Sequence, residues 1–251
     1  MAHDNSGKQL NTFHLFAGAG GGILADLLLG HNPIGACEIE PYPRNVLLQR
    51  QRDGILPEFP IWDDICTLDG RPWRGTVGVL AGGFPCQDIS SSGGGKGLSG
   101  ERSGLWFEYL RLIEEIGPEF VFAENSPNLR TRGLATVIKG LASLGYDSRW
   151  CILGSSDFGA AHVRKRMWIL AYPYSKRQSK QGGLLDAVSP KKVDDREADW
   201  FKYVFQGRSM PYVCGEDHAV AHGVDRLKAI GNGQDPVVAA NAFKILSEGL
   251  I

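Results

Sequence analysis

The stretch TFHLFAGAGGGILADLLL, residues 12–29, places an apolar run directly before a cluster of glycines and a second apolar run. The pattern predicts a short strand over 12–16, a glycine turn and then a helix over 23–29, because glycine tolerates a tight connection between strand and helix. An acidic residue, Glu38 or Glu40, follows at the spacing at which a carboxylate binds the ribose hydroxyls of a dinucleotide. These features indicate a site for an adenosine-containing cofactor; a purely structural turn is the alternative.

The same alternation continues along most of the chain. Short apolar runs predict further strands at 35–38, 77–80, 120–123, 149–153 and 167–171. Segments with apolar residues at helical spacing lie at 44–52, 105–116, 137–144 and 235–250. Alternating strands and helices are typical of an α/β fold with a doubly wound, mostly parallel sheet. The alternation fails between Tyr174 and His222, which predicts a small irregular insertion.

Composition excludes several broad classes of protein. Of 251 residues 43% are hydrophobic, which is enough for one or two packed domains and excludes wholesale disorder. The 27 basic and 28 acidic side chains nearly cancel, so the chain is not a generic polybasic nucleic-acid binder. No apolar run approaches about 18 residues and the first residues are polar, so we expect a cytoplasmic protein without a membrane segment. The five cysteines are scattered with no CxxC pair, which argues against disulfides and against a metal site.

A single cysteine, Cys86, follows the predicted strand at 77–80 in the segment GGFPCQDIS. A thiol at the end of a strand is placed for nucleophilic attack, and a nearby cation favours its reactive thiolate form. An inert, small apolar residue is the alternative, since most lone cysteines have that role. From Ser90 to Gly104 eleven of fifteen residues are Ser or Gly, a composition that favours a loop able to close over a bound substrate.

Two further groups fall at predicted strand ends. Glu124 directly follows the apolar run at 120–123, where burial raises the pKa of a carboxyl group and lets it donate a proton. The segment HVRKR places Arg164 and Arg166 on one side of a strand, where two guanidiniums suit a phosphate, a carbonyl oxygen or a thiolate. An ordinary strand end and a solvated strand edge are the alternatives. Together with the glycine turn and Cys86, these groups would supply covalent catalysis on an electron-poor ring.

The segments, in this order, resemble the motifs of the C5-cytosine DNA methyltransferase family. FAGAGG is similar to its first motif, PCQDIS to its catalytic motif, ENS to its ENV motif, HVRKR to its Q-x-R-x-R motif and GNGQDP to its C-terminal GN-x-V-x-P motif. The likeness covers residues 12–173 and 222–250. It implies the Rossmann-like fold of S-adenosylmethionine-dependent methyltransferases, with S-adenosyl-L-methionine as cofactor.

The resemblance also implies roles for single residues. Cys86 would add to C6 of a flipped-out cytosine and Glu124 would protonate or hydrogen-bond N3, so that C5 accepts the methyl group and the adduct then breaks down to 5-methylcytosine. Arg164 and Arg166 would anchor the base and its phosphate. The cofactor would be bound by residues from several parts of the chain. Phe16, Gly18 and Gly20 would line it, and Glu38 would bind the ribose hydroxyls. Ile39 would pack on the adenine, with Asp64 and Ile65 beside the ring, and Leu105 and Asn232 would complete the methionine end.

The domain organisation expected from the resemblance is simple. Residues 1–173 and 222–251 would form the catalytic, cofactor-binding domain, and 174–221 a target-recognition segment much smaller than is usual in the family. The implied partners are DNA and a separate restriction endonuclease, and the implied assembly is a monomer of bacterial or bacterial-virus type. The sequence departs from the family motifs at three places, with Ser126 in ENS, His162 in HVRKR and Gly233-Gln234 in GNGQDP.

Two other functions stay open at this point. A nicotinamide-dependent oxidoreductase would use the same glycine turn, but it gives Cys86 and Glu124 no joint purpose. A DNA-binding homologue that has lost turnover through its short recognition segment would keep the same scaffold. An assay of methyl transfer to cytosine-containing DNA distinguishes these two functions from an active methyltransferase, because neither of them would transfer methyl groups.

Overall fold

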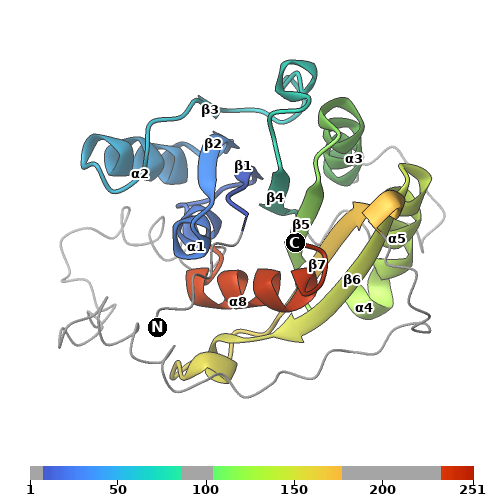
Figure 1. The fold of residues 1–251 in the computed structure, drawn as a ribbon. Helices are drawn as coiled ribbons and strands as arrows, with labels where there is room; N and C mark the ends of the chain where they lie inside the picture. The colour runs from blue at the N-terminus through green and yellow to red at the C-terminus, as the bar shows by residue number, and fades with distance from the viewer. Residues whose placement is uncertain (1–7, 86–103, 177–232) are drawn as a thin grey trace, which may run out of the picture.

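The computed structural model describes residues 8–85, 104–176 and 233–251. They form one seven-stranded sheet in the order β3-β2-β1-β4-β5-β7-β6, with helices on both faces (Figure 1). The strands are β1 (Asn11–Leu15), β2 (Asn32–Cys37), β3 (Ile61–Trp62), β4 (Val79–Gly83), β5 (Phe120–Asn125), β6 (Tyr146–Leu153) and β7 (Arg166–Pro173). The helices are α1 (Gly21–Leu29), α2 (Pro41–Arg52), α3 (Gly104–Ile116), α4 (Leu129–Arg132), α5 (Leu134–Ser143) and α8 (Pro236–Ser247), with single 3-10 turns η1 (Arg71–Trp73), η4 (Ser155–Phe158) and η5 (Tyr174–Lys176).

The direction of the strands confirms the predicted α/β fold with a mostly parallel sheet. Strands β1 to β5 pair in parallel, whereas β7 pairs antiparallel with both β5 and β6. The last two strands form a hairpin in which β7, the later strand, lies between β5 and β6. An antiparallel pair needs no crossover helix, and only the short 3-10 turn η4 separates these two strands.

The predicted elements are all present, and their ends differ for local reasons. Helix α2 begins at Pro41, not at residue 44 as predicted, because proline is tolerated in the first turn of a helix. Strand β3 has two residues and α4 has four, so neither was predicted, because neither is long enough to show a period. Strand β6 begins at Tyr146, three residues before the predicted start.

Two hydrophobic clusters cover the two faces of the sheet. On one face, α3 and α5 pack on β1 and β5 through side chains that include Tyr109, Val137 and Leu15. On the other face, α1 and α8 pack on β5 and β7, where Phe122 stacks on Trp168 with ring centroids 5.4 Å apart. Figure 1 shows α8 lying across the sheet beside α1. Helix α8 thus covers β5, which carries Glu124 near its end, and β7, which begins at Arg166.

The glycine turn between β1 and α1 follows from close packing. Gly20 begins α1 in the left-handed region with φ 92°, a conformation that favours glycine. A Cβ atom at Gly20 would lie 2.8 Å from Cδ2 of Leu47 on α2. The turn therefore lets α1 approach α2 closely and leaves the backbone of the turn at the edge of the sheet.

Two expectations about organisation lie largely beyond these residues. The predicted recognition segment at 174–221 is described only at its first three residues, so the proposed domain boundaries stay a prediction. Among the helices that the structure describes, none combines the length and the apolar character that a membrane crossing needs.

Candidate active site

The candidate site lies along the edge at which the parallel strands end. β1, β2, β4 and β5 end at this edge, and β7 begins there because it runs in the opposite direction. The glycine turn follows β1, Glu38 follows β2, Phe84 follows β4, and Glu124 lies near the end of β5. The fold therefore brings the predicted motifs to one edge, where ligands bind in open α/β sheets.

Glu124 is a buried carboxyl group with a cationic partner. It is 8% exposed, and its Oε1 accepts a hydrogen bond from Nε of Arg166 at 2.9 Å. Burial raises the pKa of Glu124 to about 7, although the charges of Arg166 and Arg164 act to lower it. The prediction that burial at a strand end raises this pKa is confirmed. A carboxyl group whose pKa is raised toward neutral pH is able to hold a proton there and to donate it.

The neighbouring strand β4 is shaped around this carboxyl. Gly83 pairs with Glu124 across the sheet, and a Cβ atom at Gly83 would lie only 2.6 Å from Oε2 of Glu124. The next residue, Asn125, is 2% exposed and donates from Nδ2 to the carbonyl oxygen of Phe84 at 2.9 Å. Asn125 thereby fixes the chain where it leaves β4, two residues before Cys86 in the sequence. Sequence reasoning gave Asn125 no role.

The two arginines of HVRKR act on the same carboxyl. Arg166 contacts Glu124 directly, and Arg164 donates to the carbonyl oxygen of Gly233. Burial, followed by the like charge of Arg166, lowers the pKa of Arg164. Both positive charges also act to lower the pKa of Glu124. Only Arg166 lies on β7; Arg164 precedes the strand, so the prediction that a single strand presents both side chains is wrong. The arrangement places two cations beside one acid.

The segment before α8 joins this edge from the far end of the sequence. Asp235 caps α8 and accepts a hydrogen bond from Oγ of Ser155 at 2.7 Å. The carbonyl oxygen of Gln234 lies 2.0 Å from the point that a Cβ at Gly21 would occupy, and its Oε1 lies 2.5 Å from the corresponding point at Gly22. Only glycine leaves room for this contact, so the first and last motifs are packed together.

A carboxylate from the end of β2, that of Glu38, binds the backbone of the glycine turn. Glu38 is 7% exposed; its Oε2 accepts from the backbone N–H of Gly18 at 2.6 Å and its Oε1 from that of Glu40 at 2.8 Å. Phe16 adopts φ 52°, which is uncommon for a residue with a side chain. A Cβ at Gly18 would meet nothing within 4 Å, so there is open space beside the turn. Ile39 is 63% exposed at the same end of β2.

The remaining described cofactor candidates lie on either side of this turn. Asp64 follows β3 and is half-buried, and its charge acts on the Cys37 thiol, as does that of Glu38. Burial, followed by these carboxylates, raises the pKa of the Cys37 thiol to about 12. Ile65 is buried in the hydrophobic core, and Leu105, at the start of α3, packs against the same core.

Several predicted features lie outside the described residues. They include the proposed nucleophile Cys86, the cofactor candidate Asn232 and most of the Ser/Gly-rich loop that ends at Gly104. Their roles stay predictions that rest on the sequence.

A buried polar cluster behind the glycine turn was missed by sequence reasoning. The Oδ2 atom of Asp26 accepts from Thr12 Oγ1 and lies 2.5 Å from His14 Nε2, and His31 Nδ1 lies 3.8 Å from Asp26 Oδ1. Burial acts to raise the pKa of Asp26, but the two histidines and Thr12 lower it to about 2. The available signal was a single polar residue inside each of two apolar runs: His14 in FHLF and Asp26 in ILADLLL.

The sheet order and the glycine turn define a Rossmann-like methyltransferase fold, and solved structures share it. A DNA modification methyltransferase encoded within an Escherichia coli prophage is 26% identical, with a TM-score of 0.53 over 66% of this chain and 47% of that chain. The Dnmt2 methyltransferase of Schizosaccharomyces pombe is similar in fold, with 22% identity and a TM-score of 0.55 over 70% of this chain and 53% of that chain.

The family follows from the sequence match. The model of the C-5 cytosine-specific DNA methylase family matches residues 10–204, and the chain belongs to this family. Similar curated relatives include the type II methyltransferase M.Eco47II of Escherichia coli, with 35% identity over 56% of this chain, and M.CviJI of a Paramecium bursaria Chlorella virus, with 30% identity over 65%. The matches cover 34% and 43% of those two relatives, so the chain spans less than half of their length.

Proposed function

We propose that this chain is a DNA (cytosine-5-)-methyltransferase that uses S-adenosyl-L-methionine. The observation that carries the proposal is the buried, proton-donating Glu124, held by Arg166 beside Gly83 and next to the point where the chain leaves β4 toward Cys86. Activation of a cytosine ring at C5 requires an acid, a cation pair and a cysteine; the acid and the cation pair lie at one sheet edge, and Cys86 follows Phe84 by two residues in the sequence. Membership of the family supports the same reaction.

Cys86 and Glu124 have complementary roles in this reaction. The thiolate of Cys86 forms a bond to C6 of cytosine, and the carboxyl of Glu124 gives its proton to N3, so no negative charge builds up on the ring. C5 thereby becomes nucleophilic. After methylation, loss of the C5 proton to a solvent water, release of the Cys86 thiolate and return of the N3 proton to Glu124 restore the ring as 5-methylcytosine.

Arg166 and Arg164 support the acid and the bound nucleotide. Arg166 orients the Glu124 carboxyl through the contact at 2.9 Å, which fixes the oxygen that faces the base. A guanidinium also binds the oxygen of a pyrimidine or a phosphate, as the two arginines are proposed to do. Since C5 and C6 are inaccessible in a stacked duplex, the cytosine is flipped out before it reaches Cys86.

The described residues fit an adenosine-containing cofactor. Open space lies beside Gly18, and the buried Glu38 carboxylate has used one lone pair of each oxygen, which leaves acceptors for ribose hydroxyls. The exposed Ile39 offers an apolar surface for the adenine ring. We propose that the cofactor is held by this set together with Phe16, Gly20, Asp64, Ile65, Leu105 and Asn232. When bound, S-adenosyl-L-methionine supplies an electrophilic methyl group.

DNA is the proposed macromolecular partner, and residues 174–221 are the proposed recognition segment. The relatives are named as type II methyltransferases, which motivates a restriction endonuclease as a separate partner of a monomeric enzyme. Base contacts from so short a segment are few, so we expect a short or degenerate recognition sequence.

The decisive experiment is transfer of tritiated methyl groups from S-adenosylmethionine to mixed-sequence DNA, followed by sequencing of the methylated positions. The wild-type chain is expected to label cytosine at C5, and Cys86→Ser is expected to abolish labelling while it leaves cofactor binding intact. No labelling by a wild-type chain that binds the cofactor would contradict the proposal and favour a silent DNA-binding homologue. Full labelling by Cys86→Ser would remove Cys86 from the mechanism.

A further inference from the structure

We propose that Arg111, on the outward side of α3, is a positioning residue for the adenine end of the cofactor site. The inference rests on the proposed function, because it concerns how the turn at Asp64–Ile65 is held. The hydrogen bonds described for Arg111 reach neither the glycine turn nor Glu124. Any effect of Arg111 on cofactor binding is therefore exerted through the turn at Asp64–Ile65.

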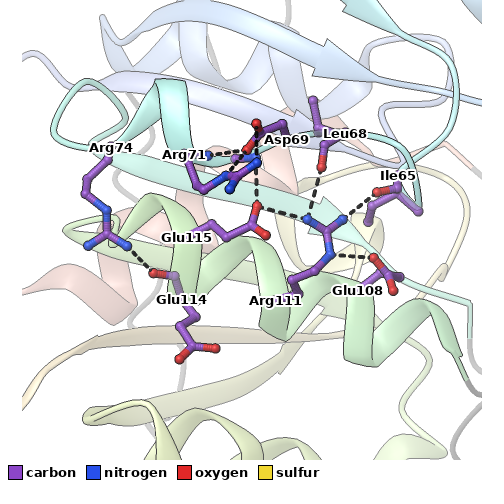
Figure 2. Close-up of polar contacts among 10 residues, drawn as sticks. Ile65, Leu68, Asp69, Arg71, Arg74, Glu108, Arg111, Glu114 and Glu115 are labelled. Carbon is purple, nitrogen blue, oxygen red and sulfur yellow. Dashed lines mark hydrogen bonds and ion pairs between the residues drawn. The ribbon is translucent and has the colours of Figure 1, made fainter.

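The guanidinium of Arg111 binds two backbone carbonyl groups of the segment that follows β3. Its Nη2 donates to the carbonyl oxygen of Ile65 at 2.9 Å, and its Nη1 donates to that of Leu68 at 3.0 Å (Figure 2). Ile65 is one of the proposed adenine-side residues and directly follows Asp64. Arg111 therefore holds the main chain of the proposed site itself, from a helix 46 residues further along the sequence.

Two carboxylates of α3 complete the attachment. Nε of Arg111 donates to Glu108 at 2.7 Å, and Nη1 donates to Oε2 of Glu115 at 2.9 Å. The same Oε2 accepts the backbone N–H of Gly70 at 2.8 Å, and a Cβ at Gly70 would lie 2.9 Å from it. The segment 65–70 is thus fastened to one face of α3 at Ile65, Leu68 and Gly70.

Local hydrogen bonds hold Asp64 to the residues that follow it, so the position of Asp64 depends on that of Ile65. The Oδ1 atom of Asp64 accepts from the backbone N–H of Cys66 at 2.9 Å, and the carbonyl oxygen of Asp64 accepts from N and Oγ1 of Thr67, both at 3.1 Å. Oγ1 of Thr67 in turn accepts from Nε1 of Trp62 at 3.0 Å. Asp64 and Ile65 therefore move with the segment as one unit.

Helix α3 also carries the other end of the proposed site. It begins at Gly104, and Leu105 is the residue proposed at the methionine end of the cofactor. Arg111 lies two turns further along the same helix. By fastening the segment 65–70 to α3, it sets the separation between the residues at the two ends of the cofactor, and preorganised sites bind more tightly than mobile ones.

The chemistry of this contact requires arginine. A planar fork with five donors is able to bind two carbonyls and two carboxylates at once, whereas lysine has three donors at one point. Arg71 provides a matched control, because it lies on the same stretch of chain and its two bonds, at 2.8 and 2.9 Å, go to the exposed Asp69. Its side chain is 76% exposed, against 31% for Arg111.

The test measures affinity for S-adenosylhomocysteine by calorimetry, and KM for S-adenosylmethionine separately from kcat, in four proteins: wild type, Arg111→Met, Arg111→Lys and Arg71→Met. We expect Arg111→Met to weaken cofactor affinity and raise KM by about tenfold, with kcat at saturating cofactor within about threefold of wild type. Arg111→Lys should give a smaller loss, and Arg71→Met should match wild type. Arg111→Lys covers the case in which Arg111→Met fails to fold.

Each outcome separates this inference from the function on which it rests. Unchanged affinity in a folded Arg111→Met or Arg111→Lys protein, while the wild type binds, overturns the positioning role alone. An equal loss in Arg71→Met also overturns it, because the effect would then belong to surface charge. A wild-type chain that binds neither ligand overturns the proposed function and this inference together.

Discussion

Replacement of Glu124 by Gln tests the electrostatics of the site through the stability of the fold. The variant keeps the shape of the side chain and removes its titration. In the wild type, burial raises the pKa of Glu124 from 4.5 to about 7. The folded protein therefore binds a proton more tightly than the unfolded chain, and wild-type stability falls as the pH rises from about 4.5 to about 7.

The magnitude follows from the size of the shift. One pKa unit corresponds to about 1.4 kcal/mol, so the free energy of unfolding of the wild type loses about 3 kcal/mol to Glu124 across this window. The free energy of unfolding of Glu124→Gln does not fall in this way, because glutamine does not titrate. The stability of the variant relative to the wild type should therefore rise by about 3 kcal/mol between about pH 4.5 and pH 8, whatever the absolute cost of the substitution.

Urea unfolding followed by circular dichroism, at half-unit steps of pH, measures this difference directly. Glu119→Gln is the control: burial acts to raise the pKa of Glu119, but Lys176 and Lys8 lower it overall. The midpoints of both its folded and its unfolded titrations then lie below about pH 5, so the Glu119→Gln difference should be nearly flat from about pH 5.5 to pH 8. A flat difference for Glu124→Gln as well would refute the raised pKa and the proton-donating role that depends on it.

Three further outcomes follow from the same contacts. Gly83→Ala should lower methyl transfer by about tenfold or more while cofactor affinity is kept, because the new Cβ would lie 2.6 Å from Oε2 of Glu124; transfer at the wild-type rate would contradict the packing argument. Arg166→Ala should raise the pKa of Glu124 further, seen as a shift of the pH–stability profile to higher pH, and Arg166→Lys should shift it less; coincident profiles would deny the ion pair. His14→Ala should lower the free energy of unfolding by about 3 kcal/mol in urea titrations, since it strips the buried Asp26 of a close partner, and a loss below about 1 kcal/mol would show that the pair is dispensable.

The parts of the site that could be predicted from sequence have local causes. An apolar run followed by glycines marks a strand and its turn, and an acid placed directly after a buried strand, as at Glu124, is desolvated by the strand itself. Parallel strands then bring these ends to one edge, so Glu38 and Glu124 are brought there by fold class alone. Each of these signals lies within one short segment of the sequence, so no contact with a distant segment is needed to recognise it.

The parts that could not be predicted depend on contacts between distant segments. β7 lies between β5 and β6, an order that hydrophobic pattern does not specify. Arg111 stands at a position on α3 that reads as a solvated helix face, since Glu108 and Glu115 flank it, and its carbonyl partners are more than 40 residues away. Gln234 is a departure from the family motif whose contact with Gly21 depends on how α8 docks.

The packing of Gln234 against the first glycine turn has a consequence for the order of events during synthesis. The glycine turn leaves the ribosome long before Gln234, so a growing chain displays this edge of the sheet without its final neighbour. The edge is completed only when the segment that carries α8 has been translated and has docked on the sheet.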